Sequence, residues 1–246
     1  MLNNKHTFAL YYPNLNMHSS HLEINIDVPE LIFRIQTVLR LKKNDSLILF
    51  TQTNHALVII TGIEKKKIHV TLISQNNNTL LSPHITAALP LLKKQETEEA
   101  ISRLCEIGVN EIQLIITEKT QRSWGGNNEL TRLKRICIAA AEQSKHFSFP
   151  QIQNPIFFNQ FLNKENDSQF IFCDPKGIPF LTFIQQNPIS IQSYIILVGP
   201  EGDLSPQEKK TLSQRECTLL SLTPTILRAQ DAIVLSCGML RSLYKI

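Results

Sequence analysis

The apolar and polar positions of the chain follow different patterns in its first third and in the rest. As far as about Leu80, short apolar runs alternate with polar clusters, which is typical of a small β-barrel or sandwich. The runs cover residues 8–12, 22–26, 47–50, 56–61 and 68–73. One helix is expected among them, because apolar residues from Leu31 to Leu39 recur at helical spacing and Asp27, with Glu30 in the box position, can cap its start.

The pattern changes after residues 75–79, which include three consecutive asparagines and are interpreted as a linker. Apolar runs now alternate with segments of helical periodicity. Strands are predicted at 85–92, 112–117, 170–173, 194–198 and 217–222, and helices at 96–107, 128–145 and 231–244. Helices between strands predict a parallel sheet covered on both faces. We therefore expect an α/β protein with a small β domain over residues 1–78 and an α/β domain over residues 79–246.

The segment 194–208 combines a strand, a turn and the start of a helix. Gly199 and Gly202 can adopt positive φ and allow a ligand to approach the backbone. Ser205 can cap the following helix, with Pro206 in its first position and Glu208 completing a capping box. In an open α/β sheet, ligands bind at the carboxyl ends of strands, so this turn is a candidate site.

A second junction of the same kind follows. Thr223 and Pro224 end the run 217–222, and Ile226, Leu227 and Arg228 lead into the last helix. Backbone groups of the two junctions could bind an adenine edge and a ribose, with apolar side chains of the second junction around the base. The glycine pattern of dinucleotide-binding folds is absent from the sequence, which disfavours that class.

The composition limits which kinds of partner and site the chain can have, but it does not identify a partner. A net charge of +4 and a pI near 8.8 permit a nucleic-acid partner without requiring it. The five cysteines are scattered and the seven histidines lack ligand spacing, so neither a disulfide framework nor a metal site is expected, and a reducing cytoplasm fits best. No apolar run approaches the roughly 18 residues of a membrane span.

The two junctions carry a resemblance. GPEGDLSPQE followed by LTPTILRAQDA resembles the paired cofactor loops of the SPOUT class of RNA methyltransferases, and more narrowly those of the ribosomal RNA small-subunit methyltransferase E family, which methylates N3 of a uridine in 16S rRNA. The resemblance implies a PUA-like RNA-binding domain over residues 1–78. It also implies a C-terminal domain with a deep trefoil knot that binds S-adenosylmethionine and forms a homodimer.

Site residues follow from the junctions and the resemblance together. The candidate cofactor-binding residues are Leu197, Gly199, Glu201, Gly202, Leu222, Thr223, Pro224, Ile226 and Leu227. Arg228 is the candidate catalytic residue, since a guanidinium could stabilise charge on a deprotonated uridine or hold the phosphate of the target nucleotide; a salt bridge that fixes the loop is the alternative. Asp231 could accept the proton or cap the last helix.

Two features of the sequence leave partners open. Arg40, Lys42 and Lys43 form a basic cluster after the first predicted helix. They could contact RNA phosphates, or they could be solvated turn residues. The last helix is apolar nearly all round, so it is buried either against a partner subunit or within its own domain.

The chain departs from the family pattern at several positions. In the second junction Thr223 replaces a glycine, Gln230 a glutamate and Asp231 a threonine. A basic element expected before the helix 96–107 is replaced by Gln-Glu-Thr at 95–97, and Lys145 and His146 follow the segment AAAEQS where glycine and arginine are usual. Two alternatives therefore remain: a weakly active RNA-binding homologue, and a SPOUT methyltransferase that acts on a ribose 2′-oxygen or another RNA.

Overall fold

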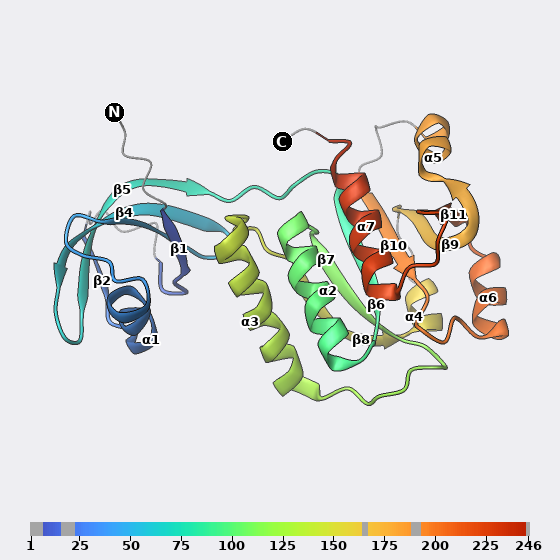
Figure 1. Cartoon of the computed structure of the whole chain (residues 1–246), viewed down its shortest axis with the longest axis horizontal. Helices are drawn as coiled ribbons and strands as arrows, with labels where there is room; N and C mark the ends of the chain where they lie inside the picture. The colour runs from blue at the N-terminus through green and yellow to red at the C-terminus, as the bar shows by residue number, and fades with distance from the viewer. Residues whose placement is uncertain (1–6, 16–22, 164–166, 188–192, 245–246) are drawn as a thin grey trace. The chain divides into compact units, whose positions relative to one another are not determined.

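The computed structural model describes residues 7–15, 23–163, 167–187 and 193–244 and divides the chain into two compact units (Figure 1). Unit 1 consists of Met1–Thr79 together with Glu142–Ser148. Unit 2 consists of Leu80–Ala141 and Phe149–Ile246. No helix in the described ranges has the length and apolar character that crossing a bilayer requires.

Unit 1 is built on a mixed sheet of five strands. The strands are β1 (Phe8–Tyr11), β2 (Glu23–Ile26), β3 (Ser46–Phe50), β4 (Asn54–Ile63) and β5 (Ile68–Asn77), in the order β1-β3-β4-β5-β2. β1 runs parallel to β3, and the other neighbours are antiparallel. The prediction of a small β-rich unit is confirmed, while its closure into a barrel stays a prediction.

Alternation along these strands explains the core of unit 1. On β4, Ala56, Val58 and Ile60 are fully buried, and the residues between them lie nearer the surface. Helix α1 (Pro29–Phe33) and the π-helical turn η1 (Arg34–Val38) add Leu31 and Ile35 to the same apolar cluster.

Two local expectations for unit 1 were wrong. The residue before α1 is Val28, and no side chain caps the helix, so Asp27 has no capping role. Residues 75–77 are not a linker, because β5 continues to Asn77 and pairs there with Asn54–Ala56 of β4. Hairpin pairing thus keeps a polar segment extended that local propensity assigns to a loop.

Unit 2 is a six-stranded, all-parallel sheet, as the alternating pattern predicts. Its strands are β6 (His84–Pro90), β7 (Glu111–Ile116), β8 (Gln151–Phe157), β9 (Gln169–Pro179), β10 (Ser193–Val198) and β11 (Thr218–Ser221). Their order is β11-β9-β10-β6-β7-β8. The central strands are buried on both faces, and Ile85, Ala87, Ala88 and Leu89 of β6 are fully inaccessible.

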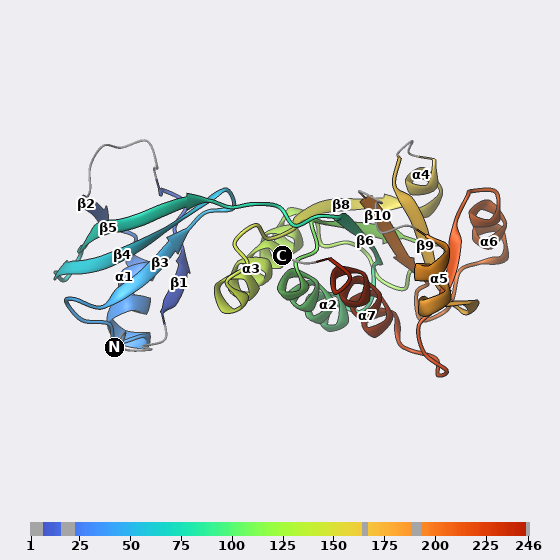
Figure 2. The ribbon, with the colours of Figure 1, turned by 90° about the horizontal axis from the view of Figure 1, so that it is seen from above.

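Helices cover both faces of this sheet. They are α2 (Lys94–Ile107), α3 (Gly126–Ser144), α4 (Phe158–Leu162), α5 (Phe180–Gln186), α6 (Pro206–Ser213) and α7 (Ala229–Arg241). α2 and α7 lie side by side on one face, and α4 lies on the other (Figures 1 and 2). α7 packs on α2, β6, β9 and β10, so its own unit buries most of its apolar surface.

Helix ends show how well local signals define the elements. Gly108 ends α2 with a φ of 84°, and Ser205 caps α6, as predicted, in a complete capping box with Glu208. The elements β8, α4 and α5 had no counterpart in the sequence analysis. The trefoil knot stays a prediction from the resemblance.

Candidate functional site

A cavity of about 570 Å³ lies in unit 2 at the carboxyl ends of β10 and β11 and beside the middle of β9. Three segments line it: residues 172–175 of β9, the first loop (residues 199–205) after β10, and the second loop (residues 222–228) after β11, which continues into the start of α7. Parallel strands end at one edge of the sheet, which is why segments far apart in the sequence form one cavity.

The first loop is a tight turn closed by its own hydrogen bonds. Asp203 N donates to Pro200 O at 2.8 Å, and Leu204 N donates to the Asp203 carboxylate at 2.7 Å. The expected positive φ is at Asp203 (59°), whereas Gly199 and Gly202 do not adopt it. The turn therefore relies on an aspartate that tolerates the left-handed region by bonding its own backbone.

The charge of Asp203 is balanced locally. Its carboxylate pairs with Lys209 of α6. Desolvation alone would raise the pKa of Asp203, but the hydrogen bonds from Lys209 and Leu204 N, with the charges of Lys209 and Lys119, lower it overall. The turn is therefore held in the state with an ionised Asp203.

The second loop forms another boundary of the cavity. Thr223 Oγ1 donates to Thr225 O at 2.7 Å, and Arg228 is the N-cap residue of α7. Ile226 is 85% exposed at this edge, although it lines the cavity. An apolar side chain this exposed beside a cavity is available to a planar ligand.

The third boundary comes from an irregularity in β9. The pairing of β9 with β11 jumps from Phe172 to Ile178, so the residues between them leave the ladder. This segment brings Cys173, Asp174 and Pro175 to the cavity. The sequence analysis did not select these residues for the site, although its predicted strand 170–173 ends directly before Asp174.

Most residues selected from the two junctions lie together. Those that line the cavity are Gly199, Glu201, Leu222, Thr223, Ile226, Leu227 and Arg228. Three others do not: Leu197 is fully buried in the cluster under α4 and α6, Gly202 lines a second, smaller cavity, and Pro224 lines neither. The roles of all of them stay predictions.

Arg228 and Asp231 differ in their surroundings. Within the described residues, no ion pair joins the exposed Arg228 side chain to another group, so the salt bridge considered as its alternative role is not seen. The interpretation of Asp231 as the cap of α7 was wrong, because the helix begins two residues earlier. Its carboxylate accepts instead from Arg103 of α2 at 3.3 Å.

The basic cluster of unit 1 is exposed. Arg40, Lys42 and Lys43 lie in the loop between η1 and β3, with Arg40 at a φ of 52°. The backbone N of Lys42 donates to Asp45 at 2.8 Å, which leaves the lysine side chain outside that turn. This exposure agrees with either interpretation of the cluster.

Glu142, from the AAAEQS segment, is not on a solvated helix face. Its carboxylate accepts two hydrogen bonds from Arg34, at 2.9 and 2.6 Å, and one from Tyr11 N at 3.0 Å. All of these groups belong to unit 1. A bidentate pair of this kind fixes orientation as well as charge.

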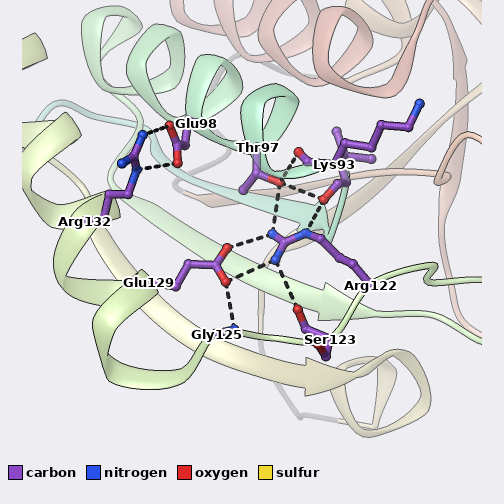
Figure 3. Close-up of polar contacts among 9 residues, drawn as sticks. Lys93, Thr97, Glu98, Arg122, Ser123, Gly125, Glu129 and Arg132 are labelled. Carbon is purple, nitrogen blue, oxygen red and sulfur yellow. Dashed lines mark hydrogen bonds and ion pairs between the residues drawn. The ribbon is translucent and has the colours of Figure 1, made fainter.

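The smaller cavity, of about 40 Å³, lies beyond the first loop and is lined by Leu91–Lys93, residues 119–122 and residues 200–202. Figure 3 shows the arginine beside it. The Arg122 guanidinium donates to Leu92 O and to Thr97 Oγ1, and pairs with the buried Glu129 at 2.8 Å. Arg122 therefore ties the β7–α3 loop to the starts of α2 and α3.

Comparison with known proteins gives one consistent family. A family model described as an RNA methyltransferase domain matches residues 80–241. Ribosomal RNA small subunit methyltransferase E of Rickettsia conorii is 29% identical over 211 residues, which cover 85% of each chain. The protein of the same name from Buchnera aphidicola is 27% identical over 217 residues, covering 81% of this chain and 82% of the relative. These relatives confirm the resemblance found in the sequence.

A solved structure extends the likeness to the fold. The crystal structure of a ribosomal RNA small subunit methyltransferase E from Neisseria gonorrhoeae bound to S-adenosyl methionine superposes with a TM-score of 0.81 at 21% identity. The match covers 97% of this chain and 98% of that one. Both units therefore have a counterpart in one solved protein.

Proposed function

The chain belongs to the RNA methyltransferase domain family, and from this premise we propose that it transfers a methyl group from S-adenosylmethionine to N3 of a uridine in 16S rRNA of the small ribosomal subunit. The observation that carries the proposal is the single cavity between the first and second loops. The relatives from Rickettsia conorii and Buchnera aphidicola, both named ribosomal RNA small subunit methyltransferase E, support the choice of RNA.

The cavity suits the cofactor in size and charge. Its volume of about 570 Å³ lies within the roughly 300–1,000 Å³ of typical ligand pockets. Three acidic residues line it, Asp174, Glu201 and Asp203. Lys209 pairs with Asp203 and Lys93 pairs with Glu201, whereas no ion pair among the described residues involves Asp174, so the Asp174 carboxylate favours a ligand that carries a sulfonium and an ammonium group. Leu222 and Leu227 would pack on the adenine, and S-adenosylmethionine supplies the methyl group when bound.

Arg228 is assigned to the nucleotide side of the site. Its exposed side chain begins α7 at the edge of the cavity. A guanidinium there stabilises the negative charge that spreads over the uridine carbonyl oxygens when N3 loses its proton. It does so without being committed to another described residue.

The remaining partners follow from the same assignment. In this proposal Arg40, Lys42 and Lys43 contact phosphates of the RNA. A protein that modifies ribosomal RNA acts in the cytoplasm, so we propose that location for it.

We also propose that the C-terminal domain forms a homodimer, because helix α7 keeps Leu235 partly exposed at 38%. Light scattering at several concentrations measures the mass of the assembly, and a monomer throughout would refute this part.

Two measurements test the main proposal. Calorimetric titration with S-adenosylmethionine should show saturable binding to the wild type. Primer extension on 16S rRNA should stop at one uridine only after incubation with protein and cofactor, because N3 methylation blocks the Watson–Crick edge. Full extension, with methyl incorporated elsewhere, would instead indicate a ribose 2′-oxygen as the target.

Arg228 is tested against a matched arginine. Arg228→Ala should lower kcat/KM about 100-fold, as loss of one charge-stabilising donor does, with cofactor affinity changed less than about threefold. Arg135, exposed on α3, is the control, and Arg135→Ala should leave both quantities unchanged. Equal effects of the two variants would refute the role of Arg228.

A further inference from the structure

The first loop lies between the two cavities described above. Gly199 and Asp203 line the larger cavity and Glu201 lines both, whereas Gly202 lines the smaller one, together with Lys119 of the β7–α3 loop. Whatever contacts the loop from the smaller cavity therefore acts on the boundary of the larger one without occupying it.

Lys119 makes that contact. Its ammonium donates to Gly202 O at 2.6 Å and to Leu204 O at 3.4 Å. Charge-assisted hydrogen bonds are stronger than neutral ones, so the carbonyl groups of these two residues are held towards Lys119. One side chain from a distant part of the sequence thus fixes two peptide groups of the loop.

We propose that Lys119 is a positioning residue, which holds the first loop in the conformation that binds the cofactor; this rests on the proposed function. In a trans peptide the C=O and N–H point in opposite directions. With the Gly202 and Leu204 carbonyls turned to Lys119, the next amides point away from it. Asp203 N then closes the turn on Pro200 O, and Ser205 N meets Glu208 in the capping box.

The backbone turn that carries Lys119 is itself held by hydrogen bonds. Thr117 and Thr120 bond each other across the turn that contains it, through Thr117 N to Thr120 Oγ1 at 2.9 Å and Thr120 N to Thr117 O at 3.1 Å. Glu118 N donates to the Glu208 carboxylate at 2.9 Å, which joins the same turn to α6. The ammonium is thus presented from a rigid turn rather than from a free loop.

Three variants separate the ammonium from the bulk of the side chain. Lys119→Met removes the charge and keeps the stem, Lys119→Arg keeps a donor, and Lys210→Met removes an exposed lysine of α6 as the control. By calorimetry, Lys119→Met should bind S-adenosylmethionine about 5- to 10-fold more weakly, Lys119→Arg should recover at least half of that loss, and Lys210→Met should equal the wild type.

Kinetics distinguish positioning from RNA contact. In Lys119→Met the KM for the cofactor should rise, while kcat at saturating cofactor and the KM for RNA change less than twofold. A rise in the KM for RNA equal to that for the cofactor would overturn the proposal, because it would indicate direct contact with RNA. Cofactor affinity within twofold of the wild type would overturn it as well.

A measurement without cofactor keeps the two proposals distinguishable. Hydrogen exchange of the peptide covering residues 199–205 should be about tenfold faster in Lys119→Met than in the wild type and in Lys210→Met. Unchanged exchange overturns the role of Lys119 even where the wild type binds cofactor. If the wild-type protein binds no S-adenosylmethionine, the proposed function is overturned, and so is the claim that Lys119 holds the first loop for cofactor binding.

Discussion

Replacing Arg122 with methionine should destabilise unit 2 by about 3 kcal/mol, which is the low end of the roughly 3–5 kcal/mol measured when one partner of a buried ion pair is removed. The Arg122 and Glu129 side chains are only 20% and 7% exposed. Without the guanidinium, the Glu129 carboxylate keeps a hydrogen bond from Gly125 N and has no cation beside it, and Leu92 O loses a donor. Partial exposure of Arg122 is the reason for choosing the lower figure.

The only tryptophan of the chain, Trp124, reports on this region. It lies two residues after Arg122, so its fluorescence during urea unfolding follows unit 2. With a slope of roughly 2–3 kcal/mol per molar urea, a loss of about 3 kcal/mol lowers the midpoint by roughly 1–1.5 M.

The control is a second pair in the same picture (Figure 3), in which the arginine is exposed and the Glu98 side chain is 16% exposed. Arg132, 58% exposed on α3, contacts Glu98 of α2 at 2.6 and 2.8 Å. Arg132→Met should cost no more than about 1 kcal/mol. The double variant R122M/E129Q, which removes the unpaired charge, should regain more than about 1 kcal/mol over R122M. Equal midpoints for R122M and R132M, or no recovery in the double variant, would refute the reasoning.

Three further predictions concern residues around the larger cavity. Gly177→Ala should lower the stability of unit 2 by about 2 kcal/mol or more in thermal unfolding, because a Cβ there would lie 2.4 Å from the Leu219 backbone; an unchanged Tm would contradict this. The pKa of Asp203 is lowered in the fold, so its contribution to stability is present above the unfolded value of 3.8 and is lost as pH falls through the folded one. The urea midpoint should therefore fall less steeply from pH 5 to pH 3 in Asp203→Asn, and parallel curves would contradict this. Burial raises the pKa of Cys173 to about 12, so iodoacetamide at pH 8 should modify it far more slowly than a free thiol, as mass spectrometry can check.

Prediction from the sequence succeeded where a signal is local. The central strands carry continuous apolar runs, and the helix after the first loop has its cap, proline and box residues within four positions. Residues 75–77 and Asp231 show the opposite case. Their sequence favoured a linker and a cap, but residues 75–77 pair with β4, and α7 begins two residues before Asp231, whose carboxylate contacts Arg103 instead. Both partners are distant in the sequence, so no local pattern reports them.

The candidate site was predictable to the same extent. The two junctions identified seven residues that line one cavity, because each follows a strand of recognisable pattern. Asp174 was missed although it directly follows the predicted strand 170–173; in the structure it lies inside β9, where the ladder with β11 is interrupted. Lys119 and Arg122 were missed because neither lies in a motif, and their partners come from other segments. Which groups hold a loop in place is a property of tertiary packing.

The order of strands in unit 2 has a consequence for biosynthesis. β10 lies between β6 and β9, yet both neighbours are translated before it. Until residues 193–198 leave the ribosome, β6 presents an unpaired edge, and β9 has no place in the growing sheet. A nascent chain that stalls before this point exposes an unpaired strand edge and apolar side chains to other chains, so aggregation or chaperone capture should concentrate there.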